Sequence, residues 1–82
     1  ARTGDDIAAV ERDLYQRYSD NLAAVIALAQ PDLSPNEAGH RATDVIVVQN
    51  GLWLNWARYQ RTDDLERGLV RCERIALEPA ES

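Results

Sequence analysis

Apolar residues recur every three or four positions along most of the chain, which predicts helices rather than strands. The pattern predicts a first helix over Asp5–Ala29, a second over Pro35–Tyr59 and a third from Thr62 to just before Pro79. Pro31 ends the first helix because a proline disfavours helical geometry in the residue before it. Short connections between helices favour antiparallel neighbours. We therefore expect an all-α, three-helix antiparallel unit that forms a single domain over residues 1–82.

Capping residues mark the predicted starts of the helices. The segment Ser34-Pro35-Asn36-Glu37 fits a capping box, in which the serine hydroxyl and the glutamate carboxylate each accept a backbone N–H of the other residue. Thr3 is placed to cap the first helix. Asp63 and Glu66 fit a second capping box at the start of the third helix.

The second helix is apolar on two sides. Its broad face holds eight residues at helical spacing: Ala38, Ala42, Val45, Ile46, Gln49, Leu52, Trp53 and Trp56. A narrower line on the opposite side holds Val47, Gly51 and Leu54. A helix that is apolar on two sides has to be covered on two sides. We expect the broad face to meet the first and third helices and the narrow line to meet a second subunit.

The first and third helices each have one apolar stripe, which we expect to be buried. The stripe of the first helix is Ile7, Val10, Leu14, Tyr18, Leu22, Val25 and Ala29, with Tyr15 and Ile26 at its side. The stripe of the third helix is Leu65, Leu69, Cys72 and Ala76.

Gly51 lies in the middle of the second helix, where glycine costs about 1 kcal/mol relative to alanine. Two explanations are open. The first is a tight local fit against the first helix, and the second is the close approach of a helix from another subunit. Polar residues around Gly51 favour the second, because an apolar centre with a polar rim is typical of interfaces.

Four aromatic residues lie on the faces that are expected to meet: Tyr15, Tyr18, Trp53 and Trp56. An aromatic stripe at helical spacing is typical of a core. The alternative is that these rings line a cavity for a small apolar ligand, with Gln49 among the few polar contacts that such pockets use. Gln49 suggests this alternative because an unpaired amide in an apolar face is costly.

Composition excludes several functions. With 14 acidic and 9 basic residues the net charge is −5, which is a poor match to a phosphate backbone, so we expect DNA to be bound only through another domain. The chain has no apolar run long enough for a membrane span and no signal peptide, which predicts a cytoplasmic protein with no membrane contact. The single cysteine, Cys72, cannot form an intramolecular disulfide.

No residues with catalytic or metal-binding spacing stand out, so we expect no enzyme activity, no metal and no cofactor. His40 is the only histidine, and a triad or a histidine-based metal site needs further groups that the pattern does not supply. Cys72 lies on the apolar stripe of the third helix, where it is expected to pack as a small hydrophobic residue.

The second and third helices together resemble a known family. The run Asp44-Val45-Ile46-Val47-Val48-Gln49-Asn50-Gly51-Leu52-Trp53-Leu54-Asn55-Trp56, followed by a short polar break and Thr62-Asp63-Asp64-Leu65-Glu66-Arg67-Gly68, is similar to the C-terminal end of tetracycline-repressor (TetR) family transcriptional regulators. The betaine-regulator-like branch is the nearest comparison, and the segment Ser34-Pro35-Asn36-Glu37-Ala38 also fits it. The resemblance covers most of residues 7–77.

The resemblance implies a homodimer in which the last two helices of each subunit form an intersubunit four-helix bundle. It also implies an effector pocket beside the first helix and an N-terminal helix-turn-helix domain that binds DNA, which this chain does not contain. The hypothesis for the dimer interface is Val47, Gly51, Leu54, Leu65, Leu69 and Cys72. The hypothesis for the effector contacts is Tyr18, Gln49, Trp53 and Trp56. The alternative function is a free-standing helical module for protein–protein interaction.

Overall fold

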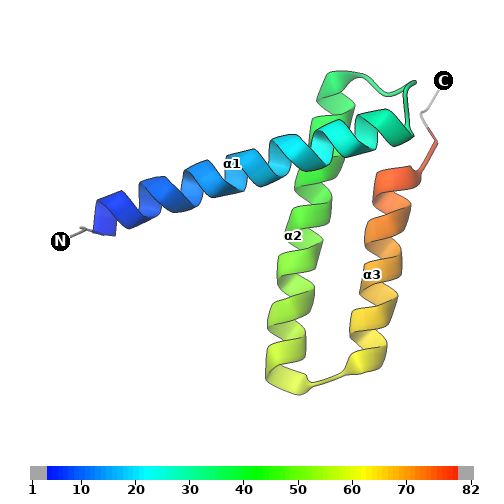
Figure 1. The fold of residues 1–82 in the computed structure, drawn as a ribbon. Helices are drawn as coiled ribbons and strands as arrows, with labels where there is room; N and C mark the ends of the chain where they lie inside the picture. Colours follow the sequence, from blue (N-terminus) through cyan, green and yellow to red (C-terminus); the bar gives the residue numbers. More distant parts are fainter. Residues whose placement is uncertain (1–3, 80–82) are drawn as a thin grey trace.

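The structure, a computed structural model, describes residues 4–79. These residues form three helices, α1 (Gly4–Ala29), α2 (Pro35–Tyr59) and α3 (Thr62–Leu77). Figure 1 shows α2 and α3 side by side as an antiparallel hairpin, with α1 crossing one face of it near one end. The three predicted helices are confirmed, and α1 begins one residue earlier than expected.

Ser34 caps α2 as predicted, because its Oγ accepts the N–H of Glu37 at 3.1 Å. At the other end, Gln60 adopts the left-handed conformation with φ 54° and donates its N–H to the Trp56 carbonyl at 2.8 Å, which ends the helix. The predicted cap of α1, Thr3, lies outside the described residues.

The capping box predicted at the start of α3 is wrong. The N-cap residue is Arg61, and it makes no side-chain capping hydrogen bond. Asp63 is therefore already inside the first helical turn and cannot act as the cap. Asp64, in the same turn, instead pairs with Arg67 and with Arg61, whose Nε lies 2.9 Å from Asp64 Oδ2. An acidic residue in the first turn is still favourable because it faces the positive end of the helix dipole.

The core lies where α1 crosses α2. Its centre is formed by Ile26 of α1 with Ala38 and Ala42 of α2, all at most 2% exposed. Leu22, Ala23, Leu33 and Ala76 pack around it. At this cluster α1 crosses α2 instead of lying antiparallel along it (Figure 1).

The apolar stripe of α1 is not buried as the sequence pattern predicts. Most of its members are about half exposed: Ile7, Val10, Leu14, Tyr18 and Val25, with Tyr15 beside them. The core contact with α2 uses only Leu22 from the stripe, together with Ile26 at its side and Ala23. The reason is the crossing, because a helix that crosses its neighbour is covered only near the crossing point (Figure 1).

The crossing also gives the molecule a flat and extended shape. It measures 51 × 32 × 15 Å, and its thinnest dimension is only slightly larger than the diameter of one helix with side chains, about 10–12 Å. The radius of gyration is 15.1 Å, whereas a compact domain of this length has a value of about 12 Å. Each helix therefore leaves a large part of its surface uncovered within this chain.

Candidate functional site

The broad face of α2 meets the other two helices, as predicted. Val45 and Ile46 are buried, and Gln49, Leu52 and Trp56 are half-buried. Trp53 is the exception, with 51% of its surface exposed.

The opposite face of α2 is uncovered. Val47 is 61% exposed and Leu54 is 60% exposed, and Gly51 between them is exposed as well. A Cβ atom added at Gly51 would meet nothing within 4 Å. Among residues 4–79 no contact therefore requires a glycine here, and the explanation by a tight fit against the first helix is wrong.

On α3, the three residues of the predicted dimer interface differ in exposure. Cys72 is buried against α2, with its Sγ 4.0 Å from the carbonyl oxygen of Val45. Burial raises the pKa of this thiol. Leu65 is half-buried, and Leu69 is 38% exposed. Leu69 is thus the most accessible of the three to another molecule.

α2 and α3 pack tightly at Gly68, a position for which the sequence pattern predicted no contact. Gly68 is buried, and a Cβ atom added there would lie 2.1 Å from Leu52 Cδ2. The side chain of Leu52 therefore occupies the space that any other residue at this position would need. The signal in the sequence was a glycine inside a helix, which has a cost that close packing offsets.

The effector residues predicted on α1 and α2 are partly brought together. Tyr18 Oη donates a hydrogen bond to Gln49 Oε1 at 3.0 Å, which supplies a partner for the amide on the apolar face. The rings of Trp53 and Trp56 pack edge to face, with centroids 6.4 Å apart. The first pair joins two helices, and the second lies within α2.

These aromatic residues do not form a closed core within this chain. Tyr15, Tyr18 and Trp53 are each between 42% and 51% exposed, and Trp56 is half-buried. The prediction that they meet in the core is wrong because α1 crosses α2 instead of running along it (Figure 1), and the rings stay partly exposed. They form an open, largely apolar surface with one hydrogen-bonded polar pair.

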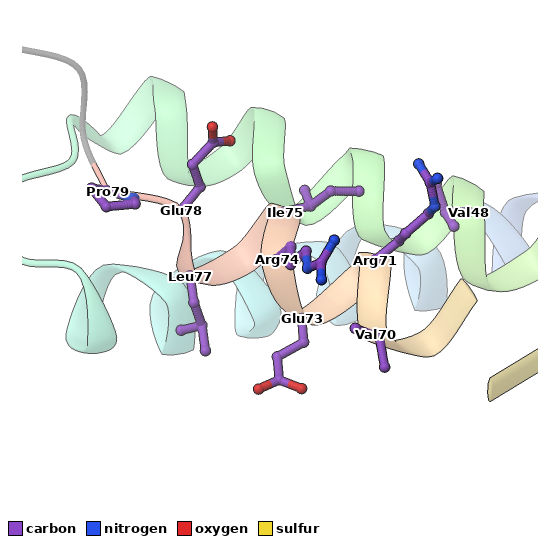
Figure 2. Close-up of a pocket in the computed structure, with 9 residues that line it drawn as sticks. All are labelled: Val48, Val70, Arg71, Glu73, Arg74, Ile75, Leu77, Glu78 and Pro79. Carbon is purple, nitrogen blue, oxygen red and sulfur yellow. The ribbon is translucent and has the colours of Figure 1, made fainter. Parts of the chain in front are cut away.

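A groove that the sequence did not indicate runs along α3. Figure 2 shows its nine lining residues, of which Val48 comes from α2 and the others from α3 and the two residues after it. Its volume is about 750 Å³. The side chains of Val70, Glu73 and Leu77 point away from α2 (Figure 2). Because the lining side chains do not converge, the groove has the form of an uncovered helix flank.

The remaining polar groups offer little chemistry. The side chain of His40 is 77% exposed, and its Nδ1 lies 4.0 Å from Glu37 Oε2. Within residues 4–79, no group of three or more histidine, cysteine or acidic side chains is arranged to hold a metal ion. None of the helices in this range is long and apolar enough to cross a membrane.

Comparison with known proteins identifies the family. A family model described as BetI-type transcriptional repressor, C-terminal, matches residues 1–77. No curated protein and no solved structure matches the sequence significantly. The match extends over all three helices and confirms the resemblance to TetR-type regulators. The chain belongs to the family of C-terminal domains of BetI-type transcriptional repressors.

Proposed function

We propose that this chain is the dimerisation and effector-sensing domain of a TetR-like transcriptional regulator. The observation that carries the proposal is the uncovered apolar line of Val47, Gly51 and Leu54 on α2. A separate domain with a helix-turn-helix binds the DNA, which agrees with the net charge of −5 on this chain. The chain itself catalyses no reaction, and the regulator works in the cytoplasm, where it meets its operator.

In the proposed homodimer, α2 and α3 pair with the same helices of a second copy in a four-helix bundle. Val47 and Leu54 are each about three-fifths exposed, so covering them in both subunits contributes about 5 kcal/mol before the cost of association. Gly51 lets the partner backbone approach between them. Leu69 is the accessible contact on α3, while Leu65 and Cys72 support the interface by holding α3 against α2.

The proposed effector contacts are Tyr18, Gln49, Trp53 and Trp56. Their partial exposure supports the proposal, because a small apolar molecule can cover the open ring faces. The Tyr18–Gln49 hydrogen bond provides polar atoms at the edge of the apolar surface. If the proposal is correct, a compound that releases the regulator from its operator changes the fluorescence of Trp53 or Trp56. Release without any change in tryptophan fluorescence would contradict the assignment of these residues.

The dimer is tested by adding bulk at the glycine. Gly51→Leu should shift the protein toward the monomer in sedimentation velocity while the helical circular dichroism signal stays largely unchanged. The matched control is Ala24→Leu, which adds similar apolar bulk at an exposed position on α1. The control should remain dimeric. Equal self-association of the two variants would mean that the second subunit does not lie against Gly51.

A further inference from the structure

The ends of α1 and α3 meet at one corner of the molecule. α1 and α3 share few contacts along their lengths, and Figure 1 shows them close together where both helices end. The connection between α1 and α2 lies at the same corner. The direct contact between α1 and α3 lies in this region.

Gln30 joins the end of α1 to the end of α3. It directly follows the last residue of α1, and its backbone N–H donates to the Ile26 carbonyl at 2.8 Å, so it remains tied to the last turn of that helix. Its side-chain Nε2 donates a hydrogen bond to the carbonyl of Leu77, the last residue of α3. A helix leaves its last carbonyls without partners, and the Gln30 amide satisfies one of them.

Arg41, a residue of α2, binds the carbonyl of Glu78, which directly follows Leu77. The residue is only 7% exposed, and one terminal guanidinium nitrogen donates to the carbonyl of Glu78. Its Nε donates to Glu37 Oε1 at 3.3 Å, so the guanidinium is held in position by its own helix. A cation at a helix C-terminus is also favoured by the negative end of the helix dipole.

Apolar packing at this corner is small. Four of the seven side chains in the cluster are alanines, namely Ala23, Ala38, Ala42 and Ala76, beside Leu22, Ile26 and Leu33. The residue that α3 contributes to this cluster is Ala76, and alanine buries little apolar area, so packing at this corner holds the end of α3 weakly. A cavity of about 460 Å³ beside Arg41, lined by residues that include Asp32 and Glu78, leaves room for the corner to rearrange. The hydrogen bonds from Gln30 and Arg41 therefore hold the end of α3 in its position at this corner.

We propose that Gln30 and Arg41 form a two-point latch on the carbonyls of Leu77 and Glu78, through which a displacement of α1 is transmitted to α3. Gln30 moves with the last turn of α1 and displaces the Leu77 carbonyl to which it is bonded. Arg41 keeps the Glu78 carbonyl at a fixed position on α2. The regulatory consequence rests on the proposed function, because α1 carries an effector contact and α3 a dimer contact. An effector that displaces α1 would then change the angle between α3 and α2 in both subunits.

The test compares the latch with length-matched variants that cannot donate a hydrogen bond. Gln30→Met and Arg41→Met retain the side-chain stems while removing the donors. In the full-length protein with Cys72→Ala and every other cysteine replaced, spin labels at Asn21→Cys on α1 and Glu73→Cys on α3 report their separation by pulsed electron paramagnetic resonance. An excess of unlabelled protein keeps the labels on one subunit of any dimer.

The intact latch should give one narrow distance maximum, and each variant should broaden or shift it, the double variant most. Two controls separate the latch from general loosening. Arg71→Met, at an exposed arginine of α3, should leave the α1–α3 distance unchanged. Labels at Ala57→Cys and Glu73→Cys should show that the α2–α3 distance persists in the latch variants, because Gly68 and Leu52 still hold that contact.

An α1–α3 distance distribution that is the same in the folded double variant as in the intact protein would overturn the latch. If the double variant does not fold, the same distance distribution is measured in the Gln30→Met variant, and an unchanged distribution there would overturn the latch. Sedimentation of the same samples distinguishes this failure from a failure of the proposed function. A monomer whose α1–α3 distance responds to the latch variants would refute the dimer and support the latch.

Discussion

An added methyl group at Gly68 should not stabilise the protein, although alanine is normally the better helix residue. A Cβ at this position would lie 2.1 Å from Leu52 Cδ2, 2.6 Å from Cδ1 and 2.8 Å from Cγ. Rotation of Leu52 about its Cβ–Cγ bond moves the two terminal carbons but leaves Cγ where it is. Relief therefore requires a new χ1 angle at Leu52 or a movement of α3 away from α2.

The expected magnitude follows from two opposing effects. Overpacking of a core contact costs about 1–3 kcal/mol, and replacing glycine by alanine inside a helix returns about 1 kcal/mol. Gly68→Ala should thus lower the free energy of unfolding by about 0–2 kcal/mol. Gly39→Ala is the matched control, because Gly39 also lies inside a helix and its added Cβ would meet nothing within 4 Å. The control should raise the free energy of unfolding by about 1 kcal/mol.

The assay is urea denaturation followed by the helical circular dichroism signal, with both variants at the same protein concentration because self-association contributes to stability. The loss of unfolding free energy in the double variant Leu52→Ala with Gly68→Ala should be smaller than the sum of the losses in the two single variants. The reason is that alanine at position 52 has no atoms where the Cβ at position 68 would lie. If Gly68→Ala proves as stabilising as Gly39→Ala, the close contact between α2 and α3 does not exist as described.

Three further predictions concern single side chains. Ser34→Ala removes the cap of α2 and should cost about 1 kcal/mol in urea denaturation; an unchanged midpoint would contradict the cap. Tyr18→Phe should cost no more than about 1 kcal/mol, because the lost hydrogen bond to Gln49 lies at a half-exposed site; a larger loss would mean that the hydroxyl is buried. Burial raises the pKa of the Cys72 thiol because the folded state favours the neutral thiol over the thiolate. The stability that the buried neutral thiol contributes is fully present below the unfolded pKa of about 8.5 and is lost as the pH rises through the higher folded pKa. The stability advantage of the wild type over Cys72→Ala should shrink accordingly as the pH rises, and a constant difference would contradict this burial.

The sequence predicts those features that depend on neighbours along the chain. The bounds of α2 follow from Ser34, Pro35 and Glu37 at one end and from the end of the apolar pattern at Tyr59. Its two faces follow from helical spacing, and the exposure of Val47 agrees with that division. These predictions succeed because capping and periodicity are local properties.

Features that depend on how the helices cross are not contained in the spacing. The stripe of α1 indicates which side is apolar but not where α2 meets it, so the exposure of Leu14 was not foreseen. The partner of Gln49 became evident only from the register between α1 and α2, which brings Tyr18 to it. The bond from Arg41 to the Glu78 carbonyl joins residues 37 positions apart, and no local pattern links them.

We expect the uncovered faces of α2 and α3 to meet a second copy of this chain. Sedimentation equilibrium of the 9.2 kDa chain over a range of micromolar concentrations tests it most directly. A dimer with twice that mass is expected, and it should dissociate on dilution or on introduction of Gly51→Leu. A folded protein that remains at 9.2 kDa throughout the range would show that these faces do not pair.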